Sequence, residues 1–303
     1  MHPPQVNSSL CGNETIRRTF IFPIQQLEFT AVTQTEKAAK FQALHQRPGA
    51  FLISNPWDAG SARVLVGLGF EALATSSGAA AATLGRRDGK LSREQALACA
   101  QAIANATDLP VSADLENGFG DSPNKVAETV RMAAETGLVG CSIEDSTGDK
   151  RRPLYDLQLA AERIAAAVHA ARSLPFHFTL TARAENFLRG NPDLDDTIKR
   201  LQAYEKAGAD VLFAPALPDL NAVRAVCSAV SRPVNFMVGI SGKSFTVAQL
   251  VEAGVKRISF ASSFYRAAMT GLIEAASEAR QTGAFSYLEK TITTAELNKF
   301  LSE

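Results

Sequence analysis

Short apolar runs recur along the chain from about residue 50 onward, separated by longer segments with helical character. The first run, at 51–54, follows an expected helix over 35–44, which Pro48 and Gly49 bring to an end. In four of these units a glycine stands between helix and strand, where a left-handed backbone turn ends the helix and leads into the strand. The eight expected strands lie at or within 51–54, 68–74, 110–113, 136–143, 178–182, 207–213, 233–237 and 253–260.

Eight apolar strands in strict alternation with helices favour a (β/α)8 barrel over an open doubly wound sheet. Parallel strands that are covered on both faces are apolar throughout, as these runs are. No G-x-G-x-x-G motif follows the first strand, which argues against a dinucleotide-binding fold. We therefore expect one barrel domain with C-terminal helices over residues 34–303. Residues 1–33 are polar, then basic and aromatic, and we interpret them as a loosely ordered N-terminal extension.

Charge and composition argue against several classes of function. The 303 residues contain 31 Lys plus Arg and 31 Asp plus Glu, so the formal net charge is zero. Nucleic acids and anionic membranes both attract clustered positive charge, so neither is an expected partner. The longest apolar runs are too short to cross a bilayer. The four cysteines form no C-x-x-C pair and the four histidines lack metal-ligand spacing, so we expect a cytoplasmic protein without a zinc site.

Acidic residues gather where several of the expected strands end. In a (β/α)8 barrel the C-terminal ends of the strands form one rim, and that rim carries the active site. Asp114 and Glu116 follow the third strand and, two residues apart, project to the same side of an extended chain. Glu144 ends the fourth strand, and Asp88 lies in the segment after the second. Each alone is a common loop-capping acid, but together the four favour a divalent cation, and their oxygen atoms suit Mg²⁺ or Mn²⁺.

Other side chains of the same rim suit an anionic substrate. Serine hydroxyls and backbone N–H groups can bind a carboxylate, and an arginine can bind one through two parallel hydrogen bonds. A tryptophan at the end of the first strand could form a wall of the pocket. The structural alternatives are a turn, core packing and, for the arginine, an ion pair with Glu185. The candidate substrate-binding residues are Trp57, Ser76, Ser77, Gly78, Arg183 and Asn235.

In order and spacing, these residues resemble the motifs of the isocitrate lyase/phosphoenolpyruvate mutase superfamily. The resemblance covers nearly everything from about Glu36 to Gln281, and the set is much more specific than any single motif. The matching segments are 55–63 (NPWDAGSAR), 77–78 (SG), 84–88 (LGRRD), 114–120 (DLENGFG), 143–145 (IED) and 181–185 (TARAE).

The resemblance implies a fold, an assembly and a metal. The family fold is a (β/α)8 barrel whose last helix is exchanged between subunits, in a homo-oligomer that is a dimer or a dimer of dimers (a homotetramer). Its members use Mg²⁺ to hold a 2-oxo or 2-hydroxy acid. Carried over by motif, the metal would contact Asp114 most closely and Asp88, Glu116 and Glu144 mostly through waters, while Ser77, Gly78 and Arg183 would bind the substrate.

The sequence departs from the family pattern at three places. The acidic motif commonly reads Asp-Ala-Asp-Thr-Gly, whereas here Glu116 is one methylene longer and Asn117 replaces the threonine. The loop at 144–156 is shorter than the gate loop of isocitrate and methylisocitrate lyases, and it has no cysteine. Ala214 and Pro215 stand where the mutase has a histidine. The expected metal and carboxylate platform is therefore combined with a different loop.

We therefore expect a Mg²⁺-dependent lyase or decarboxylase that breaks a C–C bond in a small 2-oxo or 2-hydroxy dicarboxylic acid, similar to oxaloacetate or methylisocitrate, through a metal-stabilised enolate. The catalytic candidates are Asp88, Arg183 and Tyr155, with Lys150 or Arg152 as other possible acids or bases. These loop side chains could equally be solvated charges. One alternative is an enzyme of P–C bonds acting on phosphonopyruvate or phosphoenolpyruvate. The other is a catalytically silent protein that binds 2-oxo acids.

Overall fold

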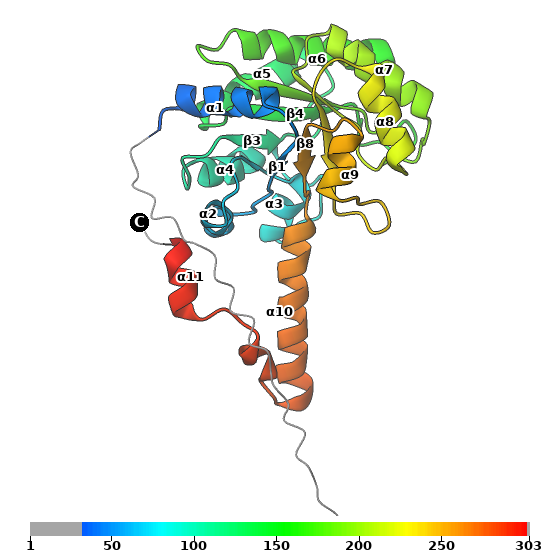
Figure 1. Cartoon of the computed structure of the whole chain (residues 1–303). Helices are drawn as coiled ribbons and strands as arrows, with labels where there is room; N and C mark the ends of the chain where they lie inside the picture. The colour runs from blue at the N-terminus through cyan, green and yellow to red at the C-terminus, as the bar shows by residue number, and fades with distance from the viewer. Residues whose placement is uncertain (1–31, 302–303) are drawn as a thin grey trace, which may run out of the picture.

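The computed structural model describes residues 32–301, and its centre is a ring of eight parallel strands (Figure 1). The hydrogen-bonded order is β1-β8-β7-β6-β5-β4-β3-β2. A bridge between Ser54 and Leu73 joins the two ends of this order, with the Ala74 N–H donating to the Ser54 carbonyl at 2.8 Å. The expected (β/α)8 barrel is therefore confirmed. The strands are β1 (Phe51–Ile53), β2 (Leu73–Ala74), β3 (Val111–Asp114), β4 (Gly140–Glu144), β5 (Thr179–Arg183), β6 (Val211–Phe213), β7 (Val234–Met237) and β8 (Arg257–Ser259).

Helices alternate with these strands, and their sequences explain where they begin. Thr33, Asp58, Ser92 and Thr246 each precede a helix and accept a hydrogen bond from a backbone N–H of its first turn, which would otherwise lack a partner. The helices are α1 (Gln34–Gln46), α2 (Ala59–Gly67), α3 (Ser77–Thr83), α4 (Arg93–Ala104), α5 (Pro123–Glu135), α6 (Leu157–Arg172), α7 (Leu194–Lys206), α8 (Leu220–Ala229), α9 (Val247–Glu252), α10 (Ser263–Thr282), the 3-10 turn η1 (Ser286–Glu289) and α11 (Thr294–Leu301).

Helix α1 covers the amino-terminal ends of the strands. Phe41 of this helix belongs to a buried apolar cluster with Phe51, at the start of β1, and Val139, just before β4. Gln34 fixes the start of the helix, because its Nε2 donates to the carbonyls of Ala134 and Leu138 at 2.7 Å each. Apolar packing thus fills this end of the barrel and leaves the carboxyl-terminal end for polar residues.

The C-terminal segment extends away from the barrel and then returns to it. Figure 1 shows α10 projecting outward, and none of its residues is buried. At the end of the segment, α11 reaches α2, where Arg63 Nη1 donates to the Leu301 carbonyl at 3.1 Å. A β-carbon at Gly67 would lie 2.5 Å from Phe300 Cδ1, so the glycine allows α11 to pack closely. Large apolar side chains of the segment are exposed, namely Leu272, Ile273, Phe285, Leu288 and Ile292.

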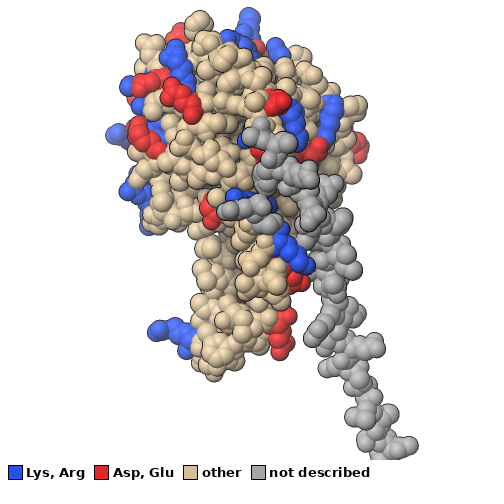
Figure 2. Space-filling view, turned by 90° about the vertical axis from the view of Figure 1, so that its left-hand side faces the viewer, with Lys and Arg blue, Asp and Glu red and all other residues tan. Residues whose placement is uncertain are grey.

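Surface charge and helix hydropathy bear on the nucleic-acid and membrane partners that the composition disfavours. Figure 2 shows positive and negative side chains interspersed over the face in view. Among residues 32–301, no helix combines the length and the apolar character that crossing a membrane requires. The interpretation of residues 1–33 as an extension lies outside the described residues, except for Val32 and for Thr33, the N-cap of α1.

Candidate active site

A cavity of about 220 Å³ opens among the carboxyl-terminal ends of the strands. This is the end of a (β/α)8 barrel at which active sites lie. The volume is below the roughly 300–1,000 Å³ of sites for drug-sized ligands, so the cavity suits a small molecule. Seven of the residues that the sequence predicts for the site line it: Ser76, Ser77, Gly78, Asp88, Asp114, Arg183 and Asn235.

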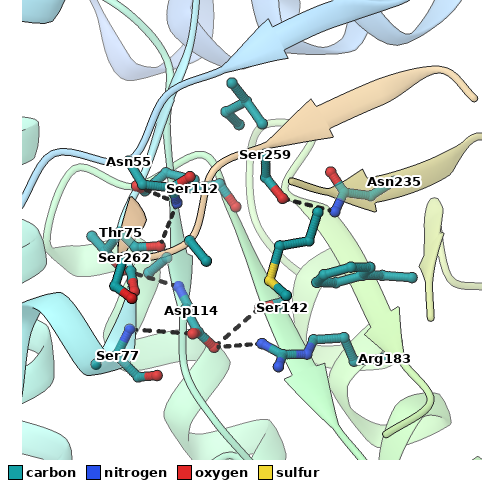
Figure 3. Close-up of a pocket in the computed structure, with 18 of the residues that line it drawn as sticks. Asn55, Thr75, Ser77, Ser112, Asp114, Ser142, Arg183, Asn235, Ser259 and Ser262 are labelled. Carbon is teal, nitrogen blue, oxygen red and sulfur yellow. Dashed lines mark hydrogen bonds and ion pairs between the residues drawn. The ribbon is translucent and has the colours of Figure 1, made fainter. Parts of the chain in front are cut away.

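Asp114, the last residue of β3, is the centre of a hydrogen-bond network in this cavity (Figure 3). Its Oδ2 accepts from the Ser77 N–H at 3.2 Å. Its Oδ1 accepts from Arg183 Nη1 at 3.3 Å and from Ser142 Oγ at 3.5 Å. The Asp114 N–H in turn donates to Thr75 Oγ1 at 3.0 Å. Three of these groups therefore orient the carboxylate, and the fourth holds the backbone of the same residue.

Glu116 and Asp88 bring two further carboxylates close to Asp114. Glu116 has a φ of 49°, a left-handed conformation that is uncommon for a residue with a β-carbon and that is often found at functional sites. Burial, followed by the charges of Asp114 and Asp88, raises the pKa of Glu116 to about 7. Asp88 lies against Gly78, where a β-carbon would come within 3.4 Å of Asp88 Cγ. Glu116 itself stands beside the cavity and does not line it.

The residues present fit a hydrated divalent cation. A carboxylate whose pKa is raised by acidic neighbours, as that of Glu116 is, is stabilised by a cation beside it, and a set of oxygen ligands suits Mg²⁺ or Mn²⁺. Within residues 32–301, no three acidic, histidine or cysteine side chains are close enough together to hold an ion directly. Mg²⁺, however, keeps several waters and is often bound through one or two carboxylates. Asp114, which lines the cavity, would hold such an ion directly, and Asp88 and Glu116 would hold it through water.

Arg183, the last residue of β5, belongs to a cluster of ion pairs. Its Nη2 lies 3.4 Å from Oε2 of Glu144, its register partner on β4, and 2.8 Å from Glu185 Oε1. Arg189 Nη2 lies 2.8 Å from Glu144 Oε1. Burial opposes the charge of Arg183, but the carboxylates of Glu185 and Glu144 outweigh it and keep the pKa of Arg183 above its usual value. Glu144, expected as a metal ligand, thus has both oxygens engaged by arginines and does not line the cavity.

Tyr155, expected as an acid or base, lies away from the cavity lining. It follows a short hairpin in which Ser146 pairs with Leu154. Its hydroxyl donates to Asp121 Oδ1 at 2.6 Å, and the guanidinium of Arg163 lies 4.1 Å from the centre of its ring. Burial and the hydrogen bond to Asp121 raise the pKa of Tyr155 to about 12. These contacts give the phenol a structural role in the hairpin.

Trp57 is also outside the cavity lining. Its ring packs edge-on against that of Tyr265, with 5.5 Å between the ring centroids. Lys150 and Arg152 lie at the exposed tip of the hairpin. The expected aromatic wall and loop acid are therefore not part of the cavity in this conformation.

Several lining residues are absent from the sequence-based set. They face inward from the strands or directly follow them, and a small polar residue within an apolar strand is the signal that could have identified some of them. Arg257 is the clearest case, since a charged residue inside an expected buried strand needs an explanation. The additional polar residues are Asn55, Thr75, Ser112, Ser142, Arg257, Ser259 and Ser262.

Comparisons with known proteins find relatives over most of the chain. A family model for phosphoenolpyruvate phosphomutase matches residues 41–280. The 2-methylisocitrate lyase of Shewanella oneidensis strain MR-1 is 31% identical over 244 residues, 77% of this chain and 82% of that protein. The crystal structure of a Burkholderia cenocepacia J2315 protein provisionally named a lyase/mutase is 50% identical, with a TM-score of 0.87 over 89% of this chain and 97% of that one. Oxaloacetate acetylhydrolase in complex with oxalate is 25% identical, with a TM-score of 0.80 over 89% and 94% of the two chains.

Proposed function

This chain belongs to the phosphoenolpyruvate phosphomutase family, in the isocitrate lyase/phosphoenolpyruvate mutase superfamily, and from that premise we propose that it is a Mg²⁺-dependent lyase or decarboxylase of a small 2-oxo or 2-hydroxy dicarboxylic acid. The bond that breaks is a C–C bond, as in oxaloacetate or methylisocitrate. The metal-dependent chemistry of the family and the residues that line this cavity both support this reaction.

The proposal rests on the group of three carboxylates that Asp114, Glu116 and Asp88 form. Asp114 is fixed by Ser77 and Arg183, and Glu116 has a pKa of about 7 because burial and its acidic neighbours disfavour its charge. A bound Mg²⁺ or Mn²⁺ would supply positive charge at the substrate oxygen that becomes negative as the C–C bond breaks. Asp114 would hold it directly, and Asp88 and Glu116 through water. Glu144 is the least favourable ligand of the four, because two arginines engage it.

The chain's own residues would orient the substrate and stabilise charge. Arg183 lines the cavity, and its Nη1 is directed toward Asp114, so it can bind the carboxylate or the developing oxyanion beside that acid. Ser77 and Gly78 would bind the substrate carboxylate at the start of α3. Loss of CO₂ from a β-keto acid needs no protein nucleophile, which agrees with a loop at 144–156 that has no cysteine. The proton that completes the product would then come from water.

The exposed C-terminal segment supports a homo-oligomer. Helix α10 has no buried residue, and apolar side chains such as Leu272 and Ile273 are exposed on it. Contiguous exposed apolar surface commonly marks an interface. We propose that a second subunit covers this segment, with α10 exchanged in a dimer or a dimer of dimers. A cytoplasmic location remains a prediction from the composition.

Measurement of products distinguishes the proposal from its alternatives. The protein would be incubated with oxaloacetate, 2-methylisocitrate or phosphonopyruvate, each with Mg²⁺ and with EDTA, beside protein-free blanks. Metal-dependent release of pyruvate from either of the first two supports the proposal. Phosphate from phosphonopyruvate would favour the P–C bond enzyme instead. No metal-dependent turnover of any of the three would favour a binding protein.

A further inference from the structure

Arg257, a residue that the proposed reaction does not use, crosses the interior of the barrel. It begins β8, is 5% exposed, and lines the cavity. Its Nε donates to Asn235 Oδ1 at 2.8 Å, and its Nη2 donates to Thr181 Oγ1 at 3.0 Å. Because Asn235 belongs to β7 and Thr181 to β5, two other strands position the guanidinium.

This guanidinium carries a charge that no carboxylate of the described residues balances. Its Nη1 is buried and has no hydrogen-bond partner, and within residues 32–301 no acidic oxygen lies within 4.0 Å of it. Burial lowers the pKa of Arg257 to about 9, which still leaves it protonated at neutral pH. A buried charge without a partner is strongly unfavourable. An anion that entered the cavity would therefore compensate the charge of Arg257 and lower the free energy of the molecule.

Three other arginines with little exposed surface differ from Arg257, although Arg163 Nε, which is outside the cavity lining, is also buried without a partner. Arg163, at 1% exposure, donates to three backbone carbonyls of the loop after β3. Arg200 pairs with Asp145 at 3.1 Å and with Asp196 at 2.7 Å. Arg183 has three carboxylate partners. Arg257 alone among these four combines a lining position with an unpartnered nitrogen.

The cavity consequently has two ends of opposite character. One end holds Asp114 and the crowded acids beside it, which favour a cation. The other holds Arg257 with the amide of Asn235 and the hydroxyl of Ser259, which are hydrogen-bonded to each other at 3.0 Å. Figure 3 shows the Asn235–Ser259 pair apart from the Asp114–Arg183 pair. A ligand that satisfies both ends has a metal-binding group at one end and an anionic group at the other.

We propose that Arg257 binds the distal carboxylate of the substrate at the inner end of the cavity, and that it thereby selects dicarboxylic over monocarboxylic acids. The identity of the acid's other end, a 2-oxo or 2-hydroxy carboxylate beside Asp114, rests on the proposed function. Because Arg257 lines the cavity and is only 5% exposed, the ion pair forms in a low-dielectric interior, where charge-assisted hydrogen bonds are strong. Arg257 thus determines which acid binds, and it has no part in breaking the C–C bond.

Binding of malate and lactate tests this inference independently of turnover. Both are 2-hydroxy carboxylic acids, and only malate has a second carboxylate. Calorimetry with Mg²⁺ should show malate binding to the wild-type protein at least about tenfold more tightly than lactate. In Arg257→Gln, which removes the charge and keeps a polar side chain, malate affinity should fall by about 10- to 100-fold while lactate affinity changes by less than about threefold.

Two further variants isolate the charge. Arg257→Lys keeps the cation and should retain most of the preference for malate. Arg172→Gln removes an arginine that pairs with Asp210 on the outside of the barrel, and it should leave both affinities unchanged. The inference is overturned if wild type binds the two acids equally, if Arg257→Gln retains the preference, or if that variant weakens both ligands alike. If Arg257→Gln does not fold, equal binding of the two acids by wild type still overturns the inference, and Arg257→Met takes the place of the glutamine variant. Absence of turnover would refute the proposed function and leave this ratio unaffected.

Discussion

Tyr155 donates its phenolic hydrogen to Asp121 across 2.6 Å, and this bond joins the hairpin after β4 to the loop after β3. Asn117 of the same loop donates to the Tyr155 hydroxyl at 3.2 Å. The tyrosine that the sequence suggests as an acid or base therefore connects two segments of the carboxyl-terminal end. Its contribution is to the geometry of the loops around the cavity.

Tyr155→Phe should lower stability and preserve catalysis. Loss of a hydrogen bond to a charged group should lower the free energy of unfolding by about 1.5–3 kcal/mol, while kcat on the best substrate should change little. Urea unfolding and steady-state kinetics measure the two effects. Tyr287→Phe, in η1 outside the barrel, is the matched control. A large loss of kcat with unchanged stability would restore Tyr155 as a catalytic residue.

The raised pKa of Glu116 predicts a loss of stability with rising pH that Mg²⁺ should reduce. Its folded-state pKa is raised from 4.5 to about 7, so its contribution to stability is fully present below pH 4.5 and is lost as pH rises through 7. Glu116→Gln should remove this loss. In EDTA, the stability of wild type relative to the variant should therefore fall between pH 5 and pH 8, and Mg²⁺ should reduce the fall. Urea unfolding measures it, with Glu135→Gln on α5 as control; no effect of Mg²⁺ would argue against a cation at this site.

His45 predicts an opposite dependence on pH. Burial, followed by the charge of Arg257, lowers its pKa from 6.5 to about 3, and its Nε2 is buried without a partner. The neutral ring therefore contributes stability above pH 6.5 that is lost progressively as pH falls toward 3. Between pH 6 and 4, wild type should lose about 1.4 kcal/mol per pH unit more than His45→Leu. Urea unfolding measures the slopes, and His169→Leu on α6 controls for the exchange itself. Equal slopes for wild type and His45→Leu would contradict the burial of a neutral ring.

Gly140 at the start of β4 allows close packing of the barrel. A β-carbon there would lie 2.7 Å from the Thr179 carbonyl oxygen on β5 and 3.2 Å from Phe41 Cε1. Gly140→Ala should therefore lower the free energy of unfolding by about 1–3 kcal/mol or more, because the strand pair must separate. Thermal or urea unfolding measures this. Gly60→Ala, where the nearest atom would be an ordinary 3.6 Å away, is the matched control and should not destabilise. Equal stability of the two variants would show that the strands can move apart freely.

The barrel can be predicted from the sequence because the patterns that indicate its strands and turns are local. Apolar runs such as 178–182 are buried on both faces in β5, and Gly137 and Gly208 have left-handed backbones just before β4 and β6, as expected. The rim position of Asp114 and Arg183 follows from the same rule, since both are the last residues of their strands.

The remaining details depend on contacts between distant residues. Trp57 packs against Tyr265, more than 200 residues later in the chain, and nothing near Trp57 indicates this. The left-handed backbone of Glu116 changes where its side chain lies, whereas two-residue spacing assumes an extended chain. Arg257 has its partners on β5 and β7, so only the assembled barrel reveals its unpartnered nitrogen.

If Asp114 holds the metal for C–C bond cleavage, Mg²⁺-dependent release of pyruvate from oxaloacetate should depend on its carboxylate, and the measurement compares wild type with Asp114→Asn. The rate is corrected for the protein-free reaction, Asp195→Asn on α7 is the control, and melting temperatures verify the fold. Wild type and the control should release pyruvate in a metal-dependent reaction, and Asp114→Asn should lose about 100-fold or more of this rate with an unchanged melting temperature. Wild-type rates in Asp114→Asn, or a wild-type rate that EDTA does not lower, would contradict it.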